Sequence, residues 1–325
     1  MKSWFGSKRV PKTVGSNPVS LSRNKLSELH LHNYVIGLKS DGVRYILFMC
    51  LRNGGMGTPL AVLIDRAGNM YEVEVMAVAE YFTKETILEG ELVWRHPDEG
   101  AMLFLVFDAI RIKGESFIDK TFTERIEAVE RCTRLSEEIS MIGDVAELEA
   151  RVAETDAIVM MPFDPLIMVR PKRFVSIEHT RSVWDARAEA QHRVDGLVIH
   201  RCNAAYRNGS ATDTIFKWKP VHSVDLAGPP TQLKHASGHV DANTFWGRKV
   251  VILPSRVACV NDTDVAEYHI DVATDGSVHL FAMRTRPDKR TPNSLKVIQA
   301  TLQDFLDNIL PEEIAQSVRG SGAHA

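Results

Sequence analysis

The sequence has few cysteines and no long apolar run, and each absence narrows the class of protein. Four cysteines in 325 residues are too few for a disulfide framework, and their spacing matches no metal-binding motif. We therefore expect reduced thiols and an intracellular protein. The longest apolar runs, such as 101–107, are much shorter than the roughly 20 residues that cross a bilayer, so no membrane partner is expected.

The chain also lacks an overall excess of basic residues, which would have indicated nucleic-acid binding. Its formal net charge is -3, and hydrophobic (44%) and charged (25%) residues occur in ordinary globular proportions. The start differs, because residues 1–26 carry six lysines and arginines and no acidic residue. This start has no apolar segment of the kind found in signal peptides, and it fits either a solvated tail or an arm that contacts RNA.

Residues 34–220 read as a strand-rich domain with a few helices. Strands are predicted at 34–51 with a turn at Asp41–Gly42, and at 59–76, 87–94, 101–110, 193–201 and 214–220. A helix is predicted over 119–139 with Thr or Asp as its N-cap, and 147–160 reads as a helix that continues into a strand.

The pattern changes after Pro220. Residues 221–245 are loop-like and contain Gly-Pro-Pro, whereas 247–260, 265–273 and 277–286 are short strands spaced as in a small β-barrel. The segment 293–310 is an amphipathic helix. Its apolar stripe consists of Leu295, Ile298, Leu302, Phe305 and Ile309.

A lysine stands in the middle of the first strand-like stretch, "YVIGLKSDGVRYILF" (34–48). Burying an ammonium group is costly unless the group is paired or used in chemistry. A lysine that attacks a phosphate must be uncharged, and neighbouring cations and burial favour the uncharged amine. Lysines, arginines and a metal held by carboxylates would balance the phosphate charge. We therefore expect further lysines and acids to converge on Lys39.

Six short motifs supply such a set. In chain order they are "KSDGVR" (39–44), "LEGELV" (88–93), "FLVFDAI" (104–110), "DGLVI" (195–199), "FKWKP" (216–220) and "RPDKRTPN" (286–293). Each motif alone is weak, but their order and spacing resemble those of the covalent nucleotidyltransferases. This superfamily contains the mRNA capping guanylyltransferases and the ATP-dependent polynucleotide ligases. The resemblance runs from about residue 15 to about residue 310.

Several details resemble capping enzymes more than ligases. "KWKP" is the form found in guanylyltransferases, whereas ligases usually have an aliphatic residue between the two lysines. The Pro-Asn at 292–293 and the lead-in "GSNPVSLSRNKL" (15–26) are also similar to capping enzymes. The resemblance implies an mRNA guanylyltransferase that transfers GMP from GTP, through a covalent Lys39-GMP intermediate, to the 5'-diphosphate end of RNA.

The resemblance also assigns catalytic roles. Lys39 matches the nucleophile, and Asp195 matches the acid that supports the divalent metal, Mg²⁺ or Mn²⁺. Lys217 and Lys219 lie two residues apart, so on a strand they would share one face and grip the α-phosphate. In the second domain, Arg286, Asp288 and Lys289 would orient the leaving pyrophosphate.

A second group of residues would bind the nucleoside. Arg44 and Glu91 match the residues that contact the ribose. Phe107 would stack on guanine, with Phe104 as the alternative, and Lys172 would contact the guanine oxygen. Two departures from the family pattern are mild, because Glu89 replaces a frequent Asp and Asp195 replaces a frequent Glu, so both carboxylates remain.

The fold implied by the resemblance is α+β, with ligase-type antiparallel sheets followed by an OB-fold β-barrel. We expect a nucleotidyltransferase domain at 1–225, a linker at 221–239 and the OB-fold at 240–293. The helix at 294–312 is expected to pack back on the first domain.

The expected partners are GTP, 5'-diphosphate RNA, a separate RNA triphosphatase and a cap methyltransferase. We expect a nuclear protein if the source is a eukaryotic cell, with the cytoplasm as the site in a virus or parasite. Three alternatives stay open: an ATP-dependent polynucleotide ligase, a non-catalytic RNA-binding OB-fold protein, and a scaffold subunit that recruits a triphosphatase. The presence of Lys39, Asp195, Lys217 and Lys219 argues against the last two as sole functions.

Overall fold

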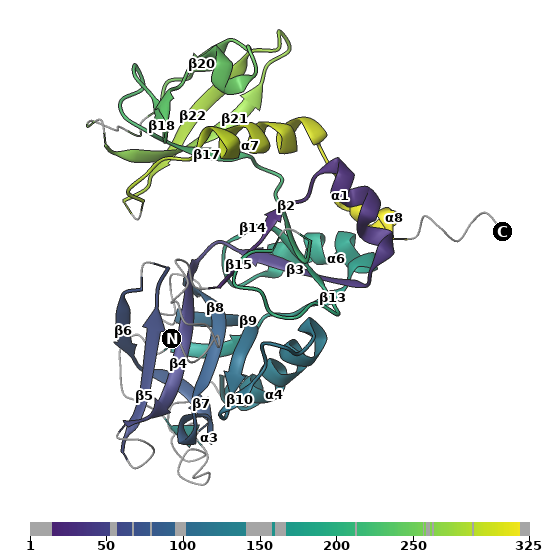
Figure 1. Cartoon of the computed structure of the whole chain (residues 1–325), viewed down its shortest axis with the longest axis vertical. Coiled ribbons are helices and arrows are strands. Elements are labelled where there is room, and N and C mark those ends of the chain that lie inside the picture. The colour runs from purple at the N-terminus through teal and green to yellow at the C-terminus, as the bar shows by residue number, and fades with distance from the viewer. Residues whose placement is uncertain are drawn as a thin grey trace, which may run out of the picture. The chain divides into compact units, whose positions relative to one another are not determined.

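The computed structural model describes residues 15–318, with gaps at 53–56, 67, 79, 95–101, 141–157, 160–166, 212, 256, 258–260, 262 and 288. Within this part of the chain two compact units form, which are considered separately. The first consists of 15–19, 28–218 and 314–318, and the second of 20–27 and 219–313 (Figure 1). The chain has a mixed α+β fold with several sheets, as expected.

The largest sheet lies in the first unit and has nine strands. Its path runs β11-β7-β12-β9-β8-β4-β5-β6, with β10 paired to β9. The strands are β4 (Val43–Leu51), β5 (Pro59–Ile64), β6 (Met70–Val73), β7 (Val75–Val78), β8 (Thr86–Trp94), β9 (Met102–Ile112), β10 (Glu115–Ser116), β11 (Ile158–Val159) and β12 (Ile167–Pro171). Most neighbours are antiparallel, and β12 is parallel to both β7 and β9.

A second sheet of five strands carries the central lysine. Its order is β13-β3-β14-β16-β2, and a separate pair joins β1 to β15. These strands are β1 (Ser16–Asn17), β2 (Val19–Ser20), β3 (Tyr34–Ser40), β13 (Val175–Ser176), β14 (Val194–Arg201), β15 (Gly209–Ser210) and β16 (Ile215–Trp218).

The turn at Asp41–Gly42 does not close a hairpin, contrary to the usual meaning of this dipeptide. β3 ends at Ser40 and β4 begins at Val43, but β3 pairs with β13 and β14, whereas β4 pairs with β5 and β8. The turn therefore carries the chain from one sheet to the other. A Cβ atom at Gly42 would overlap the backbone of β8, so this crossing requires glycine.

Helices and 3₁₀ turns occur in both units. The helices are α1 (Arg23–Glu28), α3 (Glu80–Thr83), α4 (Phe122–Ser140), α6 (Thr180–Asp185), α7 (Leu295–Asp307) and α8 (Pro311–Ser317). The 3₁₀ turns are η1 (Leu29–Leu31), η2 (Ile177–His179), η3 (Ala186–Glu189) and η4 (Ala242–Phe245). The helical part of the 147–160 prediction lies outside the described residues. No helix in the part of the chain that the structure describes is long and apolar enough to span a membrane.

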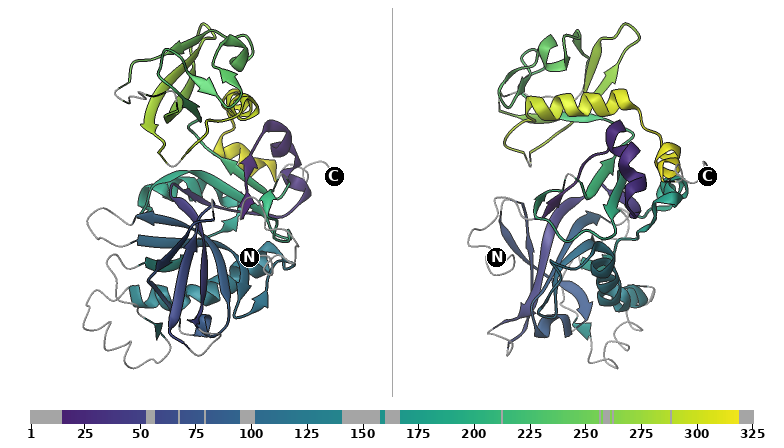
Figure 2. Two further views of the ribbon diagram at one scale, coloured as in Figure 1. Left: turned by 60° about the vertical axis from the view of Figure 1, so that its left-hand side comes forward. Right: turned by 45° about the vertical axis from the view of Figure 1, so that its right-hand side comes forward.

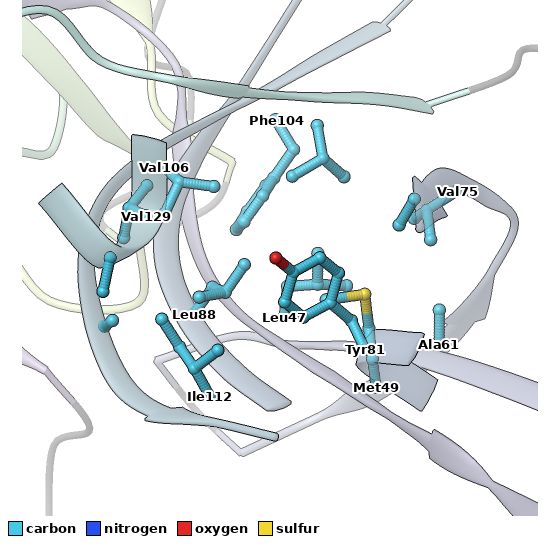
Figure 3. Packing of buried hydrophobic residues seen from close by; sticks show 14 of the residues in the cluster. Leu47, Met49, Ala61, Val75, Tyr81, Leu88, Phe104, Val106, Ile112 and Val129 are labelled. Atoms are coloured by element: carbon cyan, nitrogen blue, oxygen red, sulfur yellow. The ribbon is translucent and has the colours of Figure 1, made fainter. Parts of the chain in front are cut away.

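Helix α4 is the predicted helix at 119–139, and a capping box starts it. The backbone N–H of Thr121 donates to the Glu124 carboxylate at 2.8 Å, and the Glu124 N–H donates to the Thr121 hydroxyl at 3.3 Å. The helix packs on the large sheet, where Val129 joins Leu88, Phe104 and Val106 in one buried apolar cluster (Figure 3). This cluster is the core of the first unit.

A buried ion pair fixes α4 to β9 beside the candidate site. Arg125 of α4 makes two bonds to Asp108 of β9, at 2.6 and 3.0 Å, and both side chains are almost fully buried. Another Arg125 nitrogen donates to the Ala204 carbonyl at 2.8 Å. Such a paired and saturated geometry is what makes burial of two charges tolerable.

The second unit contains a six-stranded sheet in the order β19-β18-β17-β21-β22-β20. Its strands are β17 (Ser223–Ala227), β18 (Lys234–His235), β19 (Gly238–His239), β20 (Val250–Ile252), β21 (Val265–Val272) and β22 (Val278–Thr285). The segment 221–239, expected to be a linker, contributes β17, β18 and β19. Val224 and Leu226 alternate into the core, and the Gly-Pro-Pro that suggested a loop comes after β17.

Helix α7 differs from the expectation that it covers the first domain. Ile298 and Leu302 are fully buried in the apolar cluster of the second unit. Figure 2 shows this yellow helix lying along the sheet of its own unit. The apolar stripe was identified correctly, but a stripe does not specify which of two apolar surfaces it will cover.

Candidate active site

Lys39 and Asp195 meet at an irregularity in the five-stranded sheet. β3 and β14 are antiparallel, with Lys39 opposite Gly196 and Ser40 opposite Val194, so Asp195 is an extra residue in its strand. A β-bulge of this kind redirects a side chain. The Lys39 Nζ atom donates to Asp195 Oδ1 at 2.8 Å, and both side chains are about three-quarters buried. The two residues expected to form the catalytic centre are therefore in contact.

A second bulge exposes Phe107 to the site. In the pairing of β8 with β9, Glu89 lies opposite Asp108 and Gly90 opposite Val106, which leaves Phe107 as the extra residue. Phe107 is partly exposed and lines a pocket, whereas Phe104 is fully buried in the core. The ring available for stacking is thus Phe107, and the alternative, Phe104, is a packing residue.

The pocket encloses about 110 Å³. Five of the residues predicted from the sequence line it: Lys39, Arg44, Glu91, Phe107 and Lys172. The lead-in segment also contributes, through Ser16 and Pro18. Residues far apart in the chain, such as Lys39 of β3 and Lys172 after β12, are brought to one cavity.

Lys172 is the most deeply buried cation of the pocket. It follows β12, its backbone N–H donates to the Val106 carbonyl at 2.7 Å, and its Nζ lies 3.8 Å from the Glu91 carboxylate. The ammonium also lies 5.9 Å from the centre of the Phe107 ring. Burial, with a further effect of the Lys39 charge, lowers the pKa of Lys172 to about 8.

Arg44 forms one wall of the pocket and is held from several sides. Its guanidinium donates to the Glu89 carboxylate and to the Ser16 carbonyl, and it lies 5.3 Å from the centre of the Phe107 ring. Burial lowers the pKa of Arg44 to about 10. The Glu89 side chain has no exposed surface, and its other oxygen accepts a hydrogen bond from the Tyr206 hydroxyl at 3.0 Å.

The strand register places Lys217 on the same face of the sheet as Lys39. Val198 lies opposite both Gly37 and Lys217, and Gly37 is two residues before Lys39 on β3. Lys219 does not share this strand, contrary to expectation. β16 ends at Trp218, and Lys219 is the first residue that follows it.

The predicted residues of the second unit bind a buried acid of that unit. Arg286 donates to Asp225 at 3.1 Å, and Lys289 forms an ion pair with the other oxygen of the same carboxylate. Asp225 lies on β17, and its backbone N–H donates to the Asn293 side chain at 2.7 Å. One aspartate thus organises both ends of the 286–293 motif. Asp288 lies outside the described residues.

Three residues that support Arg44 from behind the pocket were missed or undervalued by the sequence reasoning. Glu89 was noted only as a replacement for Asp, and Tyr206 and Gly15 received no role. The lead-in motif was a signal for Gly15. Nothing in the sequence linked Tyr206 to Glu89, because 117 residues separate them.

The site offers few side chains that could bind a divalent metal. Among the residues the structure describes, no group of three or more His, Cys, Asp or Glu side chains could hold a metal ion. Two carboxylates, Asp195 and Glu91, are nevertheless present at the site. Mg²⁺ is usually bound by one or two carboxylates together with substrate phosphates and water, so this set fits Mg²⁺ in a nucleotide complex.

Comparison with known proteins identifies one family. Residues 1–221 match the family described as "mRNA capping enzyme, catalytic domain". The chain is 26% identical over 227 residues to the mRNA-capping enzyme of Caenorhabditis elegans, covering 65% of this chain and 32% of that protein. It is 22% identical over 332 aligned positions to mRNA-capping enzyme subunit alpha of Schizosaccharomyces pombe, covering 94% and 79%. It is 26% identical over 217 residues to the Mus musculus mRNA-capping enzyme, covering 65% of this chain and 34% of that protein.

Solved structures of ligases align with much of this chain, with TM-scores below 0.5. A mycobacterial DNA ligase D complexed with ATP and MES has a TM-score of 0.45 and 13% identity, covering 86% of this chain and 96% of that chain. The bacteriophage T7 ATP-dependent DNA ligase has a TM-score of 0.41 and 11% identity, covering 85% and 99%.

The different environments of the two phenylalanines predict different phenotypes. Phe104→Ala should lower the free energy of unfolding by about 3–5 kcal/mol, because it leaves a cavity in the core. Phe107→Ala should leave the melting temperature nearly unchanged, because this ring lies at the pocket and outside the core. Thermal melting of the two variants measures both effects. Equal loss of stability in both variants would contradict this assignment.

The burial of Lys172 predicts a pH-dependent stability effect. Since its pKa falls from 10.5 to about 8 on folding, the unfolded chain binds more protons at this group between these pH values. The contribution of Lys172 to the free energy of unfolding therefore rises with pH in this window, and below about pH 8 the buried charge is unfavourable. Lys172→Met should raise the melting temperature at pH 7, and this gain should shrink towards pH 10.

The exposed Lys120 provides the control for this experiment. Lys120→Met removes a lysine charge without changing a buried group, so its effect on melting should vary little from pH 7 to pH 10. A Lys172→Met protein that melts lower than wild type at pH 7 would mean that the Lys172 charge stabilises the fold through Glu91.

Proposed function

Because this chain belongs to the family of mRNA capping enzyme catalytic domains, we propose that it is an mRNA guanylyltransferase that works through a covalent Lys39-GMP intermediate. The chain aligns with only about a third of the Caenorhabditis elegans and mouse proteins, so its activity is inferred from its own site. One observation carries the proposal. Lys39 reaches a pocket that also presents an aromatic ring, Phe107, and a buried cation, Lys172, while Asp195 holds its amine.

In the proposed first step, the Lys39 amine attacks the α-phosphorus of GTP. The Nζ–P bond forms as the bond from that phosphorus to the bridging oxygen breaks, and pyrophosphate leaves with the electron pair. The proton lost from Nζ passes to the Asp195 carboxylate, which already accepts a hydrogen bond from it at 2.8 Å, and then to water. Lys217, on the same face of the sheet, stabilises the charge on the α-phosphate.

In the second step, a terminal oxygen of 5'-diphosphate RNA attacks the same phosphorus. A P–O bond forms, the Nζ–P bond breaks, and Nζ takes a proton back. The product is RNA with GMP joined through a triphosphate bridge. Lys39 and Asp195 thus serve both steps, with the proton moving in opposite directions.

A divalent metal is implied by the family, and Asp195 is the residue that would hold it, with Glu91 as the other carboxylate at the site. When bound, the ion supplies positive charge that offsets the charge of the phosphates. Both carboxylates are paired with lysines in the structure, Asp195 with Lys39 and Glu91 with Lys172. Their negative charge is therefore already directed at the site.

Guanine selection is assigned to Lys172 and Phe107. A lysine N–H is a donor and pairs with the carbonyl oxygen of guanine, whereas adenine has an amino group at the corresponding position. The ring of Phe107, near two cations, offers a stacking surface for the base. Arg44 and Glu91 border the same pocket and are assigned to the ribose.

The second unit is proposed to be an OB-fold, and the chain to act with a partner enzyme. Antiparallel β17, β21 and β22, with β20 parallel to β22 and a buried apolar core, support the OB-fold assignment. The relatives from Schizosaccharomyces pombe and Neurospora crassa are named subunit alpha. We therefore propose that this chain acts together with a separate subunit. That subunit is an RNA triphosphatase, which supplies the 5'-diphosphate end, and a cap methyltransferase acts after the transfer of GMP.

Labelling with nucleotide tests the proposed activity. Incubation with α-labelled GTP should give an acid-labile, alkali-stable protein adduct, and α-labelled ATP should give none. Lys39→Ala should abolish the adduct, and so should Lys39→Arg, because a guanidinium stays protonated and is a poor nucleophile. Lys120→Ala, at an exposed lysine, should label normally. An adduct with AMP alone would instead indicate a ligase.

Arg286 is expected to act on the leaving group of the first step. Its positive charge would stabilise the developing pyrophosphate, so Arg286→Ala should slow adduct formation from GTP by roughly 10²–10³-fold. Arg284→Ala is the matched control, because Arg284 lies two residues away and bonds to Glu267 at 2.7 Å. Single-turnover labelling measures both rates. Equal rates in the two variants would remove Arg286 from the reaction.

A further inference from the structure

The lead-in segment at the start of the described chain is built into the pocket wall. Ser16 and Asn17 form a parallel pair with Gly209 and Ser210. The Gly15 N–H donates to the Asn208 side chain at 2.6 Å, and the Gly15 carbonyl accepts from the Gly209 N–H at 2.8 Å. The segment is therefore fixed by its own backbone against residues about 190 positions later.

Gly15 is the point at which this segment touches the Arg44–Glu89 pair. A Cβ atom at Gly15 would overlap both the Glu89 carboxylate and the Arg44 guanidinium. Glycine is also favoured there by its backbone angle, φ +96°. The close approach allows the neighbouring Ser16 carbonyl to accept a hydrogen bond from Arg44.

Glu89 is the least replaceable member of this cluster. Its carboxylate has no exposed surface, and one oxygen binds Arg44 while the other accepts from the Tyr206 hydroxyl at 3.0 Å. A buried carboxylate needs every one of these partners, because water cannot replace a missing donor. Loss of the Tyr206 hydroxyl would allow Glu89 and, with it, Arg44 to move.

We propose that Gly15 and Tyr206 are positioning residues for nucleotide binding. They fix the Glu89 carboxylate and its ion pair with Arg44, and this ion pair keeps the Arg44 guanidinium over the Phe107 ring. This inference rests on the proposed function, because it assigns Phe107 to the base. A continuous series of contacts links Tyr206 to Phe107. Tyr206 bonds to Glu89, Glu89 bonds to Arg44, and the Arg44 guanidinium lies 5.3 Å from the ring centre.

The cluster is expected to control affinity and not the chemical step. Lys39 is held by Asp195 within the five-stranded sheet, whereas Arg44, Glu89 and Phe107 belong to the nine-stranded sheet. A shift of Arg44 opens the wall against which the nucleoside binds and leaves the Lys39–Asp195 contact intact. The GTP concentration for half-maximal labelling should therefore rise while the labelling rate at saturation changes little.

A pair of glycines offers a matched test. Gly15 directly precedes β1, Gly209 lies on its partner strand β15, and the two have nearly the same backbone angle, φ +96° and +91°. A Cβ atom at Gly209 meets nothing within 4 Å, whereas one at Gly15 overlaps Arg44 and Glu89. Gly15→Ala and Gly209→Ala therefore carry similar backbone strain, and only the first disturbs the cluster. Tyr206→Phe removes one hydroxyl without changing the glycine backbone.

GTP binding is measured by equilibrium dialysis in a Lys39→Ala background, in which no adduct can form. Tyr206→Phe is expected to weaken binding about 10-fold, the effect of one hydrogen bond to a charged group, and Gly15→Ala at least as much. Gly209→Ala should stay within about 2-fold of its parent. The melting temperature should fall for both glycine variants because of the backbone strain, and further for Gly15→Ala because of the overlap with Arg44 and Glu89. In proteins that retain Lys39, the labelling rate at saturating GTP should stay within about 3-fold of wild type for Tyr206→Phe.

Two results would overturn the inference. One is GTP binding by Gly15→Ala and Tyr206→Phe that equals binding by Gly209→Ala. The other is a reduced labelling rate at saturation with unchanged half-maximal GTP concentration. The proposed function is judged separately by whether the wild-type protein forms an adduct with GMP, so failure of one claim can be told from failure of the other.

Discussion

Burial of two lysine ammonium groups, those of Lys39 and Lys172, is the constraint around which the first unit is organised. The Lys39 side chain is 22% exposed and that of Lys172 only 7%, so neither is freely hydrated. Each ammonium has a carboxylate partner. Asp195 of β14 pairs with Lys39, and Glu91 of β8 pairs with Lys172. Each charge is offset within its own sheet, so the strand register of each sheet must be correct before the two sheets meet at the pocket.

Two β-bulges make this meeting possible. Asp195 and Phe107 are both extra residues in their strands, and regular pairing would leave neither in its present direction. The crossing at Asp41–Gly42 is a further irregularity, because it carries the chain from the sheet of Lys39 to the sheet of Arg44. The site is thus assembled where regular strand geometry is interrupted.

Pairing of charges recurs away from Lys39. Arg44 is satisfied by Glu89 and the Ser16 carbonyl, Arg125 by Asp108, and Arg286 by Asp225. Each cation is held before any substrate arrives, which limits the entropy that must be lost on binding. This preorganisation is a common property of the pocket wall and of the 286–293 motif.

The residue types of the site and the positions of the strands and main helices could be predicted from the amino-acid sequence. The strands on either side of Asp41–Gly42, helix α4 with its Thr121 cap and the pocket residues Lys39 and Phe107 follow from local pattern and motif order. Three features could not be predicted and arise from the packing of the folded chain: Asp41–Gly42 changes sheets, α7 covers its own unit, and Tyr206 supports Glu89. Those outcomes depend on which distant surfaces meet, and alternation of apolar residues specifies a buried face without specifying its partner.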